Sequence, residues 1–242
     1  MTRMNNLVQL TLAAHGGLER WRRFEHVSAR QRTGGVLWEI KRQRGVIDDV
    51  SVRVALRREW ASHCPFGEAT WRTSFEPRRV AIETADRQLV EERLSPRDSF
   101  AGHTQTTPWD RIQLAYFAGY AMWTYLLTPF LFTLDGVATR ELEPWRESGE
   151  SWRRLEATFA PEIATHSTVQ TFYFGPDGLL RRQDYDPDVL GGSPAAHYVE
   201  AYEEFSGMMV ATKRRVLERR SDGTSARDTV LVSIDLSDVR FT

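Results

Sequence analysis

Two histidines stand in sequence contexts where an imidazole could transfer protons. His197 follows the Gly- and Pro-rich segment 186–196 and opens a stretch whose alternate residues share one face, as in a β-strand. His103 lies in a threonine-rich loop before a long uncharged run. A neutral imidazole at the rim of a pocket can serve as general acid or base near neutral pH. We predict His103 and His197, with Tyr185, as catalytic residues; the alternatives are a hydrogen-bonded strand-end histidine and a surface-loop histidine.

Aromatic residues recur at helical spacing in the uncharged run. Tyr116, Tyr120 and Trp123 are separated by four and three residues, which places them on one face of a helix. Such a stripe is typical of a protein core. A buried phenol nevertheless needs a hydrogen-bond partner, which can be protein, water or a bound ligand. The predicted ligand-binding residues are Tyr116, Tyr120, Trp123, Trp109 and Tyr198.

Motifs for metal, nucleotide or nucleophilic chemistry are missing from the sequence. The six histidines form no HExxH or comparable metal pattern, and there is no G-x-S-x-G elbow, P-loop or dinucleotide fingerprint. We therefore predict no metal and no cofactor. Cys64 follows His63, and a Cys–His nucleophile is conceivable. Neighbours on an extended segment point apart, however, and a lone cysteine is usually a small core residue.

The composition is that of an ordinary globular protein with balanced charge. Lys and Arg total 32, Asp and Glu total 33, and hydrophobic residues make up 41%. This balance excludes the basic excess of a nucleic-acid-binding protein. β-rich chains of this length often form one domain, so we expect a single domain over residues 1–242. The single cysteine, and an N-terminus without the apolar region of a signal peptide, predict a cytoplasmic protein.

Most of the chain has the alternating pattern of β-strands joined by short turns. In 50–60 the valines alternate with polar residues, and 166–174 leads through the turn 175-GPDG-178 into 179–185, as in a hairpin. Gly34-Gly35 predicts another hairpin, between 26–33 and 36–44. An amphipathic helix precedes these strands at the N-terminus. We predict a mainly β (α+β) fold, with a strongly curved antiparallel sheet or half-barrel.

The run 112–134 is long enough to cross a bilayer of about 30 Å. It contains Gln113, three threonines and Pro129, and no Lys or Arg cluster follows it. We therefore predict no membrane span but a central apolar helix that plugs the concave face of the sheet. Thr107 and Pro108 are suited to its start, and Pro129 should kink or split its last turns.

Parts of the sequence resemble a known family. The segments 170-QTFYFGPDGLLRRQDYD-186 and 198-YVEAYEEFSGMMVATKRRV-216 resemble the later strands of LolA-like proteins, and 13-AAHGGLERWRRFEHV-27 is similar to the N-terminal start of bacterial relatives. LolA-like proteins are unclosed β-barrels with helices across the concave side, and they carry acyl chains or lipids. The resemblance implies this fold and an apolar cavity. The absence of an export signal departs from the lipoprotein carriers and points to a cytoplasmic bacterial branch.

Two functions follow from this architecture. The first is binding of a hydrophobic or aromatic small molecule in the cleft between the curved sheet and the plug helix. The alternative is a cofactor-independent lyase, isomerase or hydrolase that acts on such a molecule by histidine and tyrosine acid–base catalysis. An enzyme should have a pocket-facing histidine with a perturbed pKa and a partner that orients it, whereas the pocket of a carrier should be almost wholly apolar.

Overall fold

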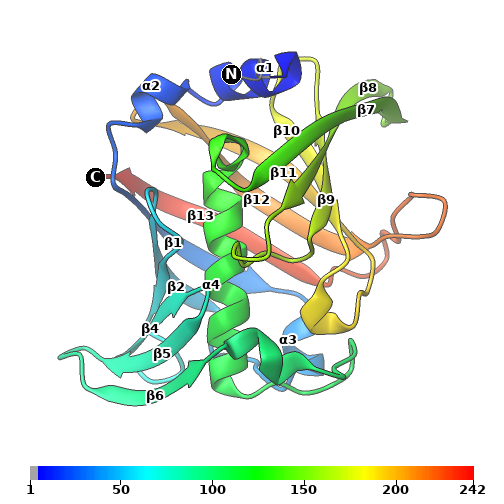
Figure 1. The fold of residues 1–242 in the computed structure, drawn as a ribbon. Coiled ribbons are helices and arrows are strands. Elements are labelled where there is room, and N and C mark those ends of the chain that lie inside the picture. The colour runs from blue at the N-terminus through cyan, green and yellow to red at the C-terminus, as the bar shows by residue number, and fades with distance from the viewer. Residues whose placement is uncertain (1–4) are drawn as a thin grey trace.

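The computed structural model describes residues 5–242 and consists of one large antiparallel sheet wrapped around a helix (Figure 1). The strands are β1 (His26–Gly34), β2 (Asp49–Ala55), β3 (Ala61–Cys64), β4 (Trp71–Glu76), β5 (Arg79–Thr84), β6 (Leu89–Leu94), β7 (Val137–Glu147), β8 (Glu150–Phe159), β9 (Val169–Phe174), β10 (Leu180–Tyr185), β11 (Ala195–Phe205), β12 (Met208–Glu218) and β13 (Val232–Phe241). The helices are α1 (Asn6–Ala14), α2 (Leu18–Trp21), α3 (Leu37–Ile40) and α4 (Arg111–Leu127), with short 3₁₀ turns η1 (Pro96–Phe100), η2 (Phe130–Thr133) and η3 (Asp188–Leu190).

The sheet has two meanders that meet in its middle. Its strand order is β6-β5-β4-β3-β2-β1-β13-β12-β11-β10-β9-β8-β7, so β6 and β7 form the two edges. The first and last strands of the chain join the halves, with Gln31 of β1 opposite Leu236 of β13. The sheet curves without closing, and α4 crosses its concave side (Figure 1). This confirms the predicted mainly β half-barrel with an N-terminal helix and a central apolar helix.

Helix α4 fills the concave face. Asp110 caps its start by accepting from the backbone N–H of Gln113, whose side chain accepts from the Asp110 N–H in return. The helix ends at Leu127 and the 3₁₀ turn η2 begins just after Pro129, so the proline splits the apolar run, which is one of the two predicted outcomes, and does not kink it. Every residue from Ile112 to Leu127 is buried. Among residues 5–242, no helix has both the length and the apolar character needed to cross a bilayer.

Close packing between α4 and the sheet explains a glycine in the middle of the helix. A Cβ atom on Gly119 would lie 2.3 Å from the ring of Phe75 on β4, so a larger residue would push the helix away from the strand. Gly119 therefore sets how near α4 approaches β4.

The predicted hairpin at Gly34-Gly35 is wrong. The segment after Gly35 turns into α3, and the partner of β1 on that side is β2. The backbone N–H groups of Val36 and Leu37 donate instead to the carbonyls of Val230 and Leu231, before β13. Since β1 already has neighbours on both sides, no free edge remains there for a strand at 36–44.

Candidate functional site

Four aromatic side chains form a hydrogen-bonded chain beneath α4. The Tyr125 hydroxyl of α4 lies 2.7 Å from Nε2 of His166, in the β8–β9 connection, and 2.9 Å from the Tyr185 hydroxyl on β10. The Tyr185 hydroxyl is also 3.3 Å from Nδ1 of His197 on β11. We call Tyr125, His166, Tyr185 and His197 the tyrosine–histidine cluster. It connects the helix to two strands and a loop through side-chain contacts alone.

Burial keeps all four members of the tyrosine–histidine cluster neutral near pH 7. It lowers the pKa of His166 to about 3 and, with help from the positive charge of Arg214, the pKa of His197 well below its ordinary value. Burial also raises the pKa values of both tyrosines. At neutral pH these groups therefore serve as hydrogen-bond donors and acceptors rather than as ions. Nδ1 of His166 and Nε2 of His197 have no hydrogen-bond partner within the described chain.

An apolar cavity of about 50 Å³ lies between α4 and the middle of the sheet. Ala118, Ala121 and Met122 line it from the helix, and Val216 and Ile234 from β12 and β13. The hydroxyl-bearing side chains Tyr125 and Tyr185 also line it, so the tyrosine–histidine cluster borders this cavity. We call it the helix–sheet cavity.

The structure brings together two of the three predicted catalytic residues. Tyr185 and His197 share a hydrogen bond because Gln183 of β10 pairs with His197 of β11, which places Tyr185 nearby on the same face. His103 is elsewhere, in the loop between η1 and α4. Its ring packs edge-on against Phe100, and its pKa is lowered by burial and by the charge of Lys41. His103 is not a member of the cluster.

The predicted aromatic stripe of α4 faces away from the tyrosine–histidine cluster except at Tyr120. The Tyr116 hydroxyl accepts a long, 3.4 Å hydrogen bond from Arg97. Tyr116 also lines a more polar cavity of about 400 Å³, near the gap between the two edges of the unclosed sheet. Tyr120 packs edge-on against His166 at 5.1 Å between ring centroids, but its hydroxyl has no partner within residues 5–242. The Trp123 indole donates to a backbone carbonyl 3.1 Å away, after β2.

Trp109 has a supporting position at the start of α4. The ammonium group of Lys41 lies 4.7 Å from the centre of its ring and donates to the carbonyls of Thr104 and Thr107 at 2.9 Å each. Burial lowers the pKa of Lys41 to about 8. These contacts hold the loop that carries His103 against α3. They do not place Trp109 on the wall of the helix–sheet cavity.

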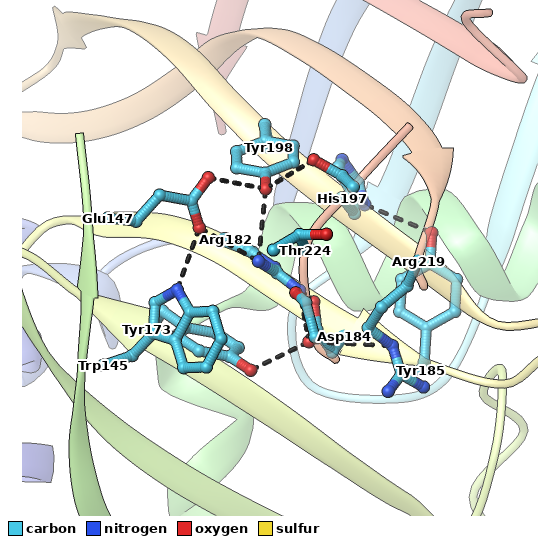
Figure 2. A network of polar contacts seen from close by, with 12 residues as sticks. Trp145, Glu147, Tyr173, Arg182, Asp184, Tyr185, His197, Tyr198, Arg219 and Thr224 are labelled. Carbon is cyan, nitrogen blue, oxygen red and sulfur yellow. Dashed lines mark hydrogen bonds and ion pairs between the residues drawn. The ribbon is translucent and has the colours of Figure 1, made fainter. Parts of the chain in front are cut away.

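Tyr198 lies on the opposite face of the sheet from His197. Successive residues of a strand point to opposite faces, and Figure 2 shows Tyr198 turned toward Glu147 and Arg182 while His197 meets Tyr185. The Tyr198 hydroxyl donates to Glu147 at 2.8 Å and accepts from Arg182 at 3.1 Å. Tyr198 therefore does not face the cleft, contrary to the prediction that it contacts a ligand there.

Arg182 is the centre of a polar network on this face of the sheet, opposite the face of His197. We call it the outer network. The guanidinium of Arg182, fully buried, pairs with Asp184 through Nε at 2.6 Å and with Glu147 through Nη1 at 3.0 Å. It also donates to the carbonyl of Gly223, at 2.7 Å, in the loop between β12 and β13. The network surrounds a buried cation with acids and aromatic rings, so it fastens this loop to the outside of the sheet (Figure 2).

Sequence reasoning missed three residues that border the site. Tyr125 is two positions beyond Trp123, off the predicted stripe. His166 lies in the β8–β9 connection, at a position that the sequence pattern presents as the start of a strand. Arg214 lies in the charge-rich run 213–220 that reads as a solvated face, yet its side chain is buried. Its alternation with Val216 and Val210 was the available signal for an inward-facing arginine.

Comparison with known proteins gives matches at the level of structure. No family model and no curated protein matches the sequence. A domain assigned to outer membrane lipoprotein sorting from Vibrio parahaemolyticus superposes with a TM-score of 0.57 at 10% identity, covering 98% of this chain and 91% of that one. A LolA superfamily protein from Nitrosomonas europaea gives a TM-score of 0.54 at 14% identity, covering 97% and 92%.

The fold is LolA-like. A DUF1329 family protein from Desulfovibrio piger also shares it, with a TM-score of 0.54 at 12% identity over 97% of this chain and 91% of that one. The LolA-like curved sheet and crossing helix thus agree with the resemblance seen in the sequence. Among the described residues, no group of three or more His, Cys, Asp or Glu side chains gathers as a metal-binding set.

Proposed function

We propose that this protein binds a hydrophobic or aromatic small molecule between α4 and the curved sheet. The observation that carries the proposal is the apolar wall of the helix–sheet cavity, which is formed from both the helix and the middle strands. Ligand sites in proteins are typically concave and apolar with a few placed polar groups, and here the hydroxyls of Tyr125 and Tyr185 are such groups. The lipoprotein-sorting assignment of one structural neighbour supports the same kind of ligand.

Binding of a ligand requires the helix–sheet cavity to expand. The cavity of about 50 Å³ is smaller than the roughly 300–1,000 Å³ of ordinary ligand sites, so side chains on its wall must repack. Met122 is suited to this because an unbranched thioether side chain adapts to irregular spaces. The small residues Ala118 and Ala121 leave further space along α4.

The acid–base alternative has one observation in its favour, the hydrogen-bonded tyrosine–histidine cluster. His166 and His197 are however absent from the residues that line the cavity, and only the tyrosines reach its wall. The lowered pKa values of His166 and His197 leave both imidazoles weakly basic at neutral pH. The geometry therefore supports binding better than proton transfer to a ligand.

Binding of the neutral, apolar probe N-phenyl-1-naphthylamine tests the proposal. We expect a saturable rise in its fluorescence with the unchanged protein. Ala121→Leu adds bulk at the cavity wall and should weaken binding at least tenfold, whereas Ala138→Leu adds the same bulk on the exposed part of β7 and should leave it unchanged. Circular dichroism verifies that both variants are folded. No saturable rise, or equal affinities for the two variants, would overturn the proposal.

A further inference from the structure

The strongest unexplained feature near the helix–sheet cavity is a buried arginine. Arg214 on β12 is 3% exposed. Its Nη2 donates to the backbone carbonyl of Tyr125 at 3.0 Å, and the guanidinium lies 5.1 Å from the centre of the Tyr125 ring. Its Nε and Nη1 have no hydrogen-bond partner among residues 5–242. The cation thus meets one carbonyl and one aromatic face, and its remaining donors are unused.

A buried cation with so few hydrogen-bond partners is unusual. Taking a charge out of water is unfavourable unless an opposite charge or several acceptors replace the water. Arg182 in the same sheet shows the usual solution, since Asp184 and Glu147 both pair with it. Arg214, by contrast, has no carboxylate partner among the described residues. Its charge contributes to the lowered pKa values of His197 and His15.

The guanidinium faces a small cavity of its own. Arg214 and Tyr125 line a space of about 20 Å³ beneath α1 and α2, together with Trp21, Phe130 and Tyr202. Tyr125 also lines the helix–sheet cavity, so it borders both spaces. We call the smaller one the arginine cavity. It places an unpaired positive charge among the aromatic and apolar side chains that line this cavity.

A second buried donor lies close to Arg214 in the sequence. The hydroxyl of Thr212, two residues earlier and on the same face of β12, is buried and has no partner within the described chain. A hydroxyl can both donate and accept, and Thr212 is not among the residues that line the arginine cavity, so the guanidinium alone defines the kind of ligand. The free donors of Arg214 require an acceptor, and its charge selects an anion.

We propose that Arg214 binds the carboxylate of an apolar acid, so that the ligand of this protein is a medium- or long-chain carboxylic acid. The inference rests on the proposed function and names the class of its ligand. A carboxylate can accept two hydrogen bonds from one guanidinium, and it is the smallest common anionic head group, as the size of the arginine cavity requires. The hydrocarbon part then lies against the apolar walls of the two cavities that Tyr125 borders.

Competition between an acid and its ester tests the proposal. Protein stripped of endogenous lipid is loaded with N-phenyl-1-naphthylamine, and the bound probe is displaced with dodecanoate, methyl dodecanoate or acetate. We expect dodecanoate to act at a concentration at least tenfold lower than its methyl ester, and acetate to have no effect. Equal potency of acid and ester overturns the proposal. Displacement by acetate also overturns it, since the site then takes a free small anion.

Two variants assign the preference to Arg214. Arg214→Met removes the charge but keeps an unbranched side chain, so acid and ester should become equal while the probe still binds. Arg215→Met is the matched control, because Arg215 lies on the other face of β12 and pairs with Asp235 at 2.8 Å; it should keep the tenfold preference. A preference retained in Arg214→Met contradicts the proposal. If that variant does not fold, the acid–ester comparison in the unchanged protein still decides. Failure of the probe to bind at all refutes the proposed function instead.

Discussion

The rings of His166 and Tyr185 lie parallel, with 3.9 Å between their centroids and 5° between their planes. This stacking fixes the direction of the Tyr185 side chain, so that its hydroxyl meets both Tyr125 and His197. The contact is made by a loop residue and a strand residue that are 19 positions apart in the sequence. The hydrogen-bonded cluster under α4 thus depends on ring packing as well as on polar contacts.

Tyrosine hydroxyls with and without partners should contribute to stability with opposite signs. Tyr125 and Tyr120 are both buried on α4, but the Tyr125 hydroxyl has two partners and the Tyr120 hydroxyl has none within residues 5–242. Tyr125→Phe leaves His166 and Tyr185 without that partner and should lower the free energy of unfolding by about 1–3 kcal/mol. Tyr120→Phe removes a buried, unsatisfied hydroxyl and should be neutral or stabilising.

Urea unfolding of the two variants, monitored by circular dichroism, measures the difference. The pair is matched because each variant loses only one oxygen atom from the same helix. A larger loss of stability in Tyr120→Phe than in Tyr125→Phe would contradict the hydrogen-bonded cluster as described.

His63 should make the protein sensitive to acid. Its side chain is fully buried on β3, and neither ring nitrogen has a partner within the described residues. Burial lowers its pKa to about 4 from the ordinary 6.5. Between these values the unfolded chain binds a proton that the folded chain does not, so stability is full above pH 6.5 and falls as the pH drops toward 4. For this one group the loss between pH 7 and pH 5 is on the order of 1–2 kcal/mol.

Replacement of His63 by leucine tests this pH dependence. His63→Leu removes the titrating group and the unsatisfied nitrogens at similar volume, so we expect a higher melting temperature at pH 7 and a larger gain at pH 5. His15, His166 and His197 also have lowered pKa values and remain in the variant, so some acid sensitivity persists. An equal gain at both pH values would show that His63 does not contribute to the acid response.

Local patterns predict the elements of this fold well, because strands and turns are encoded by nearby residues. The hairpin of β9 and β10 follows from period-two alternation and the turn 175–178, and α4 follows from its uncharged run. The pairing of β1 with β13 has no local signal, although it joins the two halves of the sheet. The failed hairpin at Gly34-Gly35 has a different cause, since the segment after Gly35 forms α3 and the strand that pairs with β1 there is β2.

The site is less predictable than the fold for a related reason. Tyr185 and His197 are recognisable as polar aromatic residues near a loop, but their contact depends on the register of β10 and β11. A shift of one residue along a strand changes the face that a side chain occupies. Tyr198, the residue after His197, therefore lies on the other face of the sheet. Arg214 sits among charged residues typical of a surface, and only the burial of the strand by α4 and the N-terminal helices reveals it.

The outer network around Arg182 should stabilise the fold without affecting the helix–sheet cavity. Arg182→Met leaves Asp184 and Glu147 largely buried, with only Arg219 and Arg227 as charged partners, and should lower the free energy of unfolding by about 3 kcal/mol. Arg153→Met, which removes a partly exposed pair with Glu141, is the control and should cost less than about 1 kcal/mol.

Because Arg182 and Tyr185 lie on opposite faces of the sheet, the affinity for N-phenyl-1-naphthylamine should remain within twofold in both variants. Urea unfolding and probe titration measure the two effects separately. A folded Arg182→Met protein with tenfold weaker probe binding would show that the outer network shapes the cavity.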